Sequence, residues 1–216
     1  MTPEKNFDSS EGLNKHRLEA LSDGIFAFAM TLLVLDLKFP KIPHDLMTPS
    51  LLKQTLFGLW PKFLSYVTSF AVLGVFWIGH HGYSHFVKRT DRWFLWLNLL
   101  FLMFIVLVPF STDLLGDYHS QRVAVMIYGS NLLALGTALY LQWWYATRGH
   151  HLVGRDLEPE LVRKGKTRIL RGIFLYTCAV LIALMNPTVS LILYALIPMG
   201  YILPSSLDHH WTHSHG

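Results

Sequence analysis

The sequence predicts an all-α membrane protein, a bundle of six transmembrane helices. Of its 216 residues, 52% are hydrophobic and only 15% are charged, whereas a soluble domain carries about 25% charged residues. The charged residues gather between apolar stretches of roughly 18–25 residues, the length that a helix needs to cross a bilayer. The net charge of +4 does not indicate nucleic acid binding, because the basic residues lie in the linkers between these stretches.

Each predicted span begins and ends where polar residues interrupt an apolar run. The first follows Arg17 and continues to Asp36, and the third starts at Trp93, just after a basic linker. The last two meet at Asn186-Pro187, which marks either two short spans or one kinked hairpin. The six predicted spans are residues 18–37, 62–86, 93–115, 122–147, 167–186 and 188–204.

The long linker at 38–61 is predicted to be non-helical or re-entrant. It contains Pro40, Pro43 and Pro49, and proline interrupts regular helices. The whole chain then divides into an N-terminal segment at 1–16, a six-span domain at 17–204 and a histidine-rich tail at 205–216.

Charge in the linkers predicts the orientation in the membrane. The segments 1–17, 87–92 and 148–168 are rich in lysine and arginine, whereas the linker at 113–121 has two aspartates and no lysine or arginine. Basic linkers are retained on the cytoplasmic side. We therefore expect a multi-pass protein of the cell membrane with both termini in the cytoplasm, although three lysines in the 38–61 linker depart from this pattern.

The first span has two chemically different faces. At 100° per residue, the side chains of Phe28, Leu32 and Leu35 form an apolar stripe, and Gly24 and Thr31 lie on the same side. The polar pair Ser22-Asp23 falls on the other side and is predicted to face the rest of the subunit.

An acidic side chain at the edge of a membrane helix needs a partner, because an uncompensated charge there is costly. The end of the second span and the start of the third offer candidates at a similar depth. Such a group has either a purely structural role or a functional one. The predicted polar network consists of Arg17, Ser22, Asp23, Trp77, His80, His81 and Asn98.

These residues carry a family resemblance. Arg17, the run LSDGIFA at 21–27 and the run TLL at 31–33 resemble the hallmark motif of the transmembrane protein 175 potassium channel family, in its prokaryotic single-repeat branch. The six-span length and the pattern WIxHH at 77–81 agree with it.

The resemblance implies a homotetramer in which four first helices line a central pore in the lipid bilayer. It implies a channel for monovalent cations, chiefly K⁺, with no enzymatic activity and no cofactor. In that family apolar side chains of the first helix narrow the pore, which implies a constriction at Phe28, Leu32 and Leu35, with Thr31 and Gly24 lining the path. No TVGYG-type filter sequence occurs in the chain.

One position departs from the family pattern. The innermost narrowing residue is usually isoleucine or leucine, and here it is Phe28. Four phenyl rings around one axis either close the pore or gate it, so a transporter or a non-conducting structural oligomer remains the alternative. A di-iron membrane enzyme is disfavoured, because His81 and His85 form only one partial ligand box. The tail histidines, residues 209, 210, 213 and 215, predict adventitious metal binding only.

Overall fold

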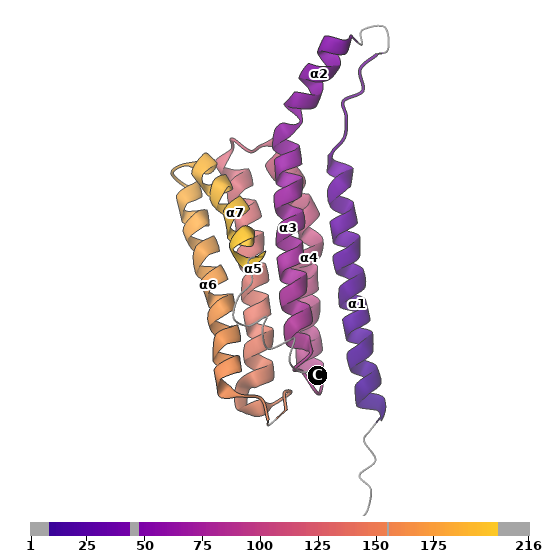
Figure 1. The fold of residues 1–216 in the computed structure, drawn as a ribbon, viewed down its shortest axis with the longest axis vertical. Coiled ribbons are helices and arrows are strands. Elements are labelled where there is room, and N and C mark those ends of the chain that lie inside the picture. Colours follow the sequence, from indigo (N-terminus) through magenta and orange to yellow (C-terminus); the bar gives the residue numbers. More distant parts are fainter. Residues whose placement is uncertain (1–8, 44–47, 155, 203–216) are drawn as a thin grey trace, which may run out of the picture.

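The computed structural model describes residues 9–43, 48–154 and 156–202. These residues form seven α-helices and two short 3-10 helices (Figure 1). The predicted histidine-rich tail lies outside the described residues. In chain order the elements are α1 (Ser9–Leu33), η1 (Val34–Asp36), α2 (Pro49–Gly58), α3 (Trp60–Ser84), α4 (Arg92–Asp117), α5 (Arg122–Thr147), η3 (Arg148–His150), α6 (Pro159–Ala183) and α7 (Pro187–Ile202).

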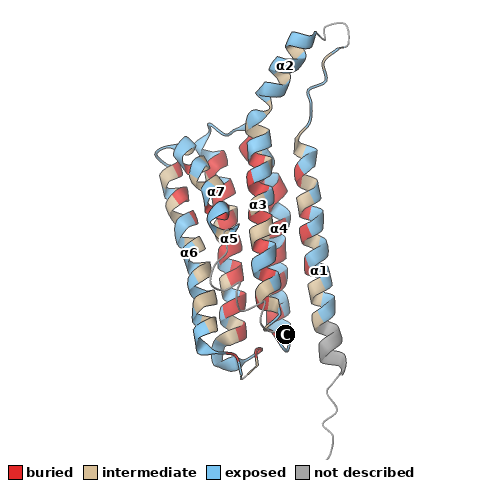
Figure 2. Ribbon diagram, in the orientation of Figure 1, coloured by how far each residue is buried: buried red, intermediate tan, exposed pale blue. Residues whose placement is uncertain are grey.

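The long helices stand side by side, with α1 at one edge of the bundle and α6 at the other (Figure 1). α4 packs against α1, α3 and α5, and α6 packs against α5 and α7. Buried residues concentrate where α3, α4 and α5 face one another, and the outward faces are exposed (Figure 2). Many exposed side chains are large and apolar, as expected where lipid rather than water surrounds a bundle.

Four helical segments are long and apolar enough to cross a membrane: Lys15–Asp36, Trp60–Ser84, Arg92–Asp117 and Arg122–His150. They match the first four predicted spans. α6 has sufficient length, but cations occupy much of its first half, and α7 has only 16 residues. Helices therefore exist at all six predicted places, while the last two lack the apolar length of ordinary spans.

The prediction for the 38–61 linker was wrong in part, because α2 forms within it. Pro49 is the first residue of α2, a position where its missing N–H leaves no hydrogen bond unmade. The Thr48 hydroxyl accepts a hydrogen bond from the Leu51 backbone N–H at 3.2 Å and so caps the helix. α2 has no buried residue and projects beyond the end of the bundle (Figure 1).

At Asn186-Pro187, where the sequence left two short spans or one kinked hairpin open, two separate helices form. α6 ends at Ala183 and α7 begins at Pro187. The Asn186 side chain accepts a hydrogen bond from the Val189 backbone N–H at 3.2 Å. Asn186 therefore acts as a helix cap, and Pro187 again takes the first helical position.

Gly129 allows α7 to pack closely on α5. A Cβ at this position would collide with the Tyr194 hydroxyl and with Val180. We expect Gly129→Ala to lower the free energy of unfolding by about 1–3 kcal/mol, the usual cost of overpacking. Thermal unfolding in detergent measures this loss. Gly79→Ala is the matched control, because no atom lies within 4 Å of its added Cβ. Equal melting temperatures for the two variants would contradict the expectation.

Candidate ion-conduction site

The face of α1 that packs against the subunit is a narrow strip of four side chains. Ser22, Phe26, Ala29 and Leu33 are all buried, and their spacing of three or four residues places them on one side of the helix. α1 contacts α3 and α4 through this strip. Leu18, Ile25 and Met30 are partly buried beside this strip, and much of the remaining surface of α1 is exposed in the single chain.

The predicted apolar stripe lies on that uncovered surface. The side chains of Phe28 and Leu35 are 61% and 57% exposed, and Leu32 is half-buried. Gly24 and Thr31 are exposed as well. The Thr31 hydroxyl donates to the Phe28 carbonyl at 2.7 Å, so its oxygen keeps lone pairs available for another partner.

Three of the predicted network residues form a buried chain of hydrogen bonds. The Asn98 side-chain amide donates to the Ser22 hydroxyl at 3.2 Å, and this hydroxyl donates to the Leu18 carbonyl at 2.9 Å. The Asn98 carbonyl oxygen lies 3.0 Å from His80 Nε2. Since a carbonyl only accepts, this nitrogen carries the proton. These hydrogen bonds join α1, α3 and α4 at one depth in the bundle.

Asp23 belongs to a separate contact beside these buried hydrogen bonds. Trp77 Nε1 donates to Asp23 Oδ1 at 2.9 Å. The Trp77 ring stacks on His81, with 5.7 Å between the ring centroids. All three residues are exposed, so this contact lies at the surface of the single chain. Arg17 is also exposed, and no hydrogen bond or ion pair joins it to these groups in the described residues.

Comparison with known proteins identifies the family. The sequence model of the family described as endosomal/lysosomal potassium channel TMEM175 matches residues 17–109. A potassium channel of Streptomyces collinus is 35% identical over 189 residues, which are 86% of this chain and 90% of the relative. The chain belongs to the TMEM175 family. The resemblance read from the motif at 17–33 is thus confirmed, as is the expectation that the chain is not an enzyme.

Further relatives agree with membership of the TMEM175 family. A potassium channel of Chamaesiphon minutus is 40% identical over 145 residues, covering 66% of this chain and 70% of the relative. The crystal structure of a lysosomal potassium-selective channel TMEM175 homolog from Chamaesiphon minutus has a TM-score of 0.78 at 33% identity, and the match covers 88% of this chain and 97% of that one. A variant of MtTMEM175, at 18% identity and a TM-score of 0.58, shows the same fold.

Sequence reasoning missed a charged cluster at the opposite end of α1 in this TMEM175-family chain. Lys62 Nζ lies 2.5 Å from Asp117 Oδ1. Asp36, in η1, lines the same small pocket as Lys62 and Asp113, and its buried Oδ2 atom accepts no hydrogen bond from the residues that the structure describes. Asp113 and Asp117 had been assigned to a linker, but α4 continues to Asp117. Their spacing of four residues on one helix face was the available signal.

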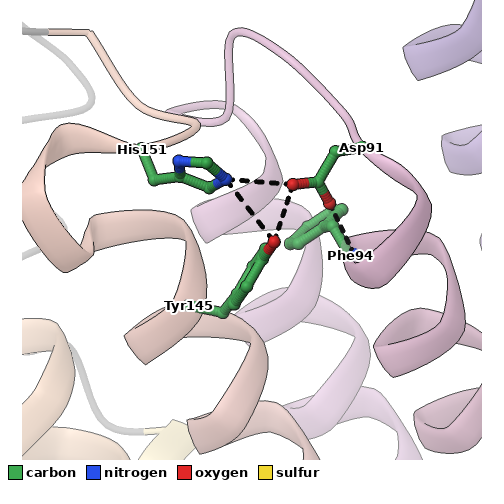
Figure 3. Close-up of polar contacts among 4 residues, drawn as sticks. All are labelled: Asp91, Phe94, Tyr145 and His151. Carbon is green, nitrogen blue, oxygen red and sulfur yellow. Dashed lines mark hydrogen bonds and ion pairs between the residues drawn. The ribbon is translucent and has the colours of Figure 1, made fainter.

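A second missed contact ties two loops together at the other end of the bundle (Figure 3). Asp91 Oδ1 accepts a hydrogen bond from the Phe94 backbone N–H at 2.8 Å, which caps α4. Asp91 Oδ2 accepts from the Tyr145 hydroxyl at 2.7 Å and from His151 Nε2 at 3.0 Å. The Lys88 backbone N–H donates to the Leu152 carbonyl at 2.8 Å. We call the group Asp91, Tyr145 and His151 the loop clasp.

The loop clasp lowers the pKa of the Asp91 carboxyl. Partial burial alone would raise this pKa, but the hydrogen bonds from Phe94, Tyr145 and His151 favour the charged form and outweigh burial. A carboxylate with a lowered pKa stabilises the folded state above its ordinary pKa of about 4. That contribution is lost as the pH falls through the pKa of the folded state.

We therefore expect the effect of Asp91→Ala on stability to depend on pH. At pH 7 the variant loses the α4 cap and is less stable by about 1 kcal/mol, a melting temperature about 2–4 °C lower. The difference from the wild type narrows as the pH falls below about 4 towards 3, because the carboxylate of the unfolded chain binds its proton first and that of the folded protein follows. Thermal unfolding at both pH values checks this. An equal difference in melting temperature at the two pH values would show that the charge of Asp91 contributes nothing to stability.

The geometry does not bring together a metal site. Within the described ranges, no three histidine, cysteine, aspartate or glutamate side chains are close enough to share an ion.

Proposed function

We propose that four copies of this chain form a potassium-permeable cation channel in the cell membrane, with α1 of each copy lining the path. The observation that supports this most directly is the apolar stripe. It lies on a membrane helix whose opposite face packs against α3 and α4, so the stripe is left uncovered in a single chain. Membership of a family whose bacterial relatives are potassium channels adds support.

In this proposal Phe28, Leu32 and Leu35 narrow the path, and Thr31 and Gly24 line it between them. Apolar side chains of this kind hold back ions by excluding water from the constriction. K⁺ sheds hydration water at a lower free-energy cost than Na⁺, so a path that requires partial dehydration favours K⁺. The alternative is that the four Phe28 rings seal the path and leave a transporter or a structural oligomer.

The hydrogen-bonded chain through Asn98 has a positioning role in this proposal. It fixes the rotation of α1 relative to α3 and α4, since a helix rotated by a few tens of degrees would take Ser22 away from Asn98. The same rotation would turn Phe28 away from the central axis. α6 and α7 complete the membrane domain as the fifth and sixth spans, and both termini lie in the cytoplasm.

Reconstitution into liposomes tests the proposed function. The mass of the purified protein in detergent first establishes whether it is a tetramer. Liposomes loaded with K⁺, Na⁺ or Rb⁺ then report flux along each gradient. We expect flux with K⁺ and Rb⁺ ahead of Na⁺, and none in protein-free liposomes. Verified tetramers that pass no cation would favour the structural oligomer. A flux that saturates at millimolar ion would favour a transporter.

A further inference from the structure

The first half of α6 holds an unusual density of positive charge for a membrane helix. Its sequence contains one acidic residue, Glu160. Glu160 pairs with Arg163 at 2.9 Å and with Lys164 at 3.8 Å. The five cations are Arg163, Lys164, Lys166, Arg168 and Arg171.

α7 ends beside the middle of this basic stretch. It runs antiparallel to α6, and it is 16 residues long against 25 for α6, so the start of α6 extends beyond it (Figure 1). Close contacts fix where α7 ends. The Tyr201 hydroxyl donates to the Arg168 carbonyl at 2.9 Å, and the Arg168 guanidinium donates to the Tyr201 carbonyl at 3.5 Å.

The aromatic ring of Tyr201 is held firmly against α6. The Arg168 guanidinium carbon lies 5.6 Å from its ring centroid, within the range of a cation–π contact. Gly172 allows the ring to approach, since a Cβ there would lie 3.0 Å from the Tyr201 hydroxyl oxygen. The result is a rigid surface at the end of α7, with a guanidinium and a phenol ring at its centre.

Arg171 lies at the edge of this surface and lacks a partner of its own. Its side chain is exposed, and no hydrogen bond or ion pair to it occurs in the described part of the chain. It lies near enough to Tyr201 for its charge to act on the tyrosine hydroxyl. The exposed neighbours Leu170 and Phe174 are apolar. An arginine among lipid-facing apolar side chains is costly unless it reaches the headgroup region or meets an anion.

We propose that Arg168, Arg171 and Tyr201 bind the headgroup phosphate of an anionic phospholipid. Guanidinium groups match phosphate oxygens in a two-pronged geometry. Helical side chains incline towards the N-terminal end of their helix, which here carries both guanidinium groups towards the headgroup region of the leaflet beside the basic loops. The exposed Leu170 and Phe174 lie where the acyl chains of such a lipid would run. The proposed lipid site does not depend on conduction, so a failed lipid-binding test would not contradict the proposed channel function, and a failed flux test would not contradict the lipid site.

Lipid titration of the purified full-length protein tests the site. Native mass spectrometry counts bound phosphatidylglycerol and phosphatidylcholine with identical acyl chains, so that only the headgroup charge differs. We expect phosphatidylglycerol to bind more tightly, and Arg171→Gln to weaken its binding about fivefold, the usual contribution of one cation near an anionic lipid surface. Arg171→Lys should retain most of the affinity.

Arg163→Gln is the matched control, because it removes a cation from the same helix that already pairs with Glu160. Its affinity for phosphatidylglycerol should equal that of the wild type. If Arg163→Gln and Arg171→Gln lose the same affinity for phosphatidylglycerol, the lipid is attracted only by the overall charge of the helix, and the proposed site is overturned. Equal binding of the two lipids would overturn it as well. If inorganic phosphate raises the melting temperature as much as phosphatidylglycerol does, the surface binds a soluble anion rather than a lipid.

Discussion

Phe28→Ala is expected to raise K⁺ flux through the reconstituted protein at least about tenfold, the change produced when a barrier falls by 1.4 kcal/mol. In the proposed tetramer the substitution removes four phenyl rings from one level of the path. The constriction there becomes wider and easier to wet, so the barrier to a partly hydrated ion falls. The measurement is initial K⁺ flux per tetramer in liposomes.

Leu181→Ala is the matched control for this substitution. Leu181 is 58% exposed in the single chain, against 61% for Phe28, but it lies on α6, which packs against α5 and α7. Its removal should leave flux unchanged. If Phe28→Ala and Leu181→Ala behave alike in verified tetramers, the apolar stripe does not line the conduction path.

Asn98→Ala is expected to lower the free energy of unfolding by about 2 kcal/mol. The substitution leaves the protonated Nε2 of His80 buried without an acceptor, and an orphaned buried donor costs about 1–3 kcal/mol. The Ser22 hydroxyl keeps its bond to the Leu18 carbonyl, so the loss on that side is smaller. Thermal unfolding in detergent measures the effect as a drop in melting temperature of about 4–8 °C.

Asn131→Ala is the control, because the same atoms are deleted from a poorly bonded asparagine. Within the described part of the chain, the two hydrogen bonds of Asn131 are long, at 3.4 Å, and its buried Oδ1 atom has no hydrogen-bond partner. Asn131→Ala should lower the free energy of unfolding by less than half as much as Asn98→Ala does. An Asn131 variant that is as unstable as the Asn98 variant would mean that the cost reflects lost volume rather than the hydrogen-bonded chain.

The sequence allowed the first four spans and the faces of α1 to be predicted, because both depend on local regularities. Apolar length identifies a membrane helix, and the helical repeat separates Phe28 from Asp23. The junction of Ser22 with Asn98 and His80 was foreseen for the same reason, as all three lie near the same end of their spans.

The missed features depend on information that spacing does not contain. α2 was missed because Pro49 was taken to interrupt a helix, whereas at the first helical position it starts one. Asp91 and His151 are 60 residues apart, and nothing local in either segment indicates that the two loops meet. α6 begins at Pro159, whereas the predicted fifth span begins at 167, because the dense charge of Arg163, Lys164 and Lys166 is typical of a linker.

The loop clasp has a consequence for the mechanics of the subunit. Together with the backbone bond between Lys88 and Leu152, it fastens the α3–α4 hairpin to the α5–α6 hairpin, so these four helices are held as one frame. Among the described residues no such contact between loops holds α1, whose buried side chains form a strip of four residues along the helix. The residues of α1 outside this strip can therefore be replaced without disturbing the packing of α3 to α6. A chimera that keeps Ser22, Phe26, Ala29 and Leu33 while taking the other residues of α1 from a relative should still pack against α3 and α4, so the proposed pore-facing surface can be changed without altering the rest of the subunit.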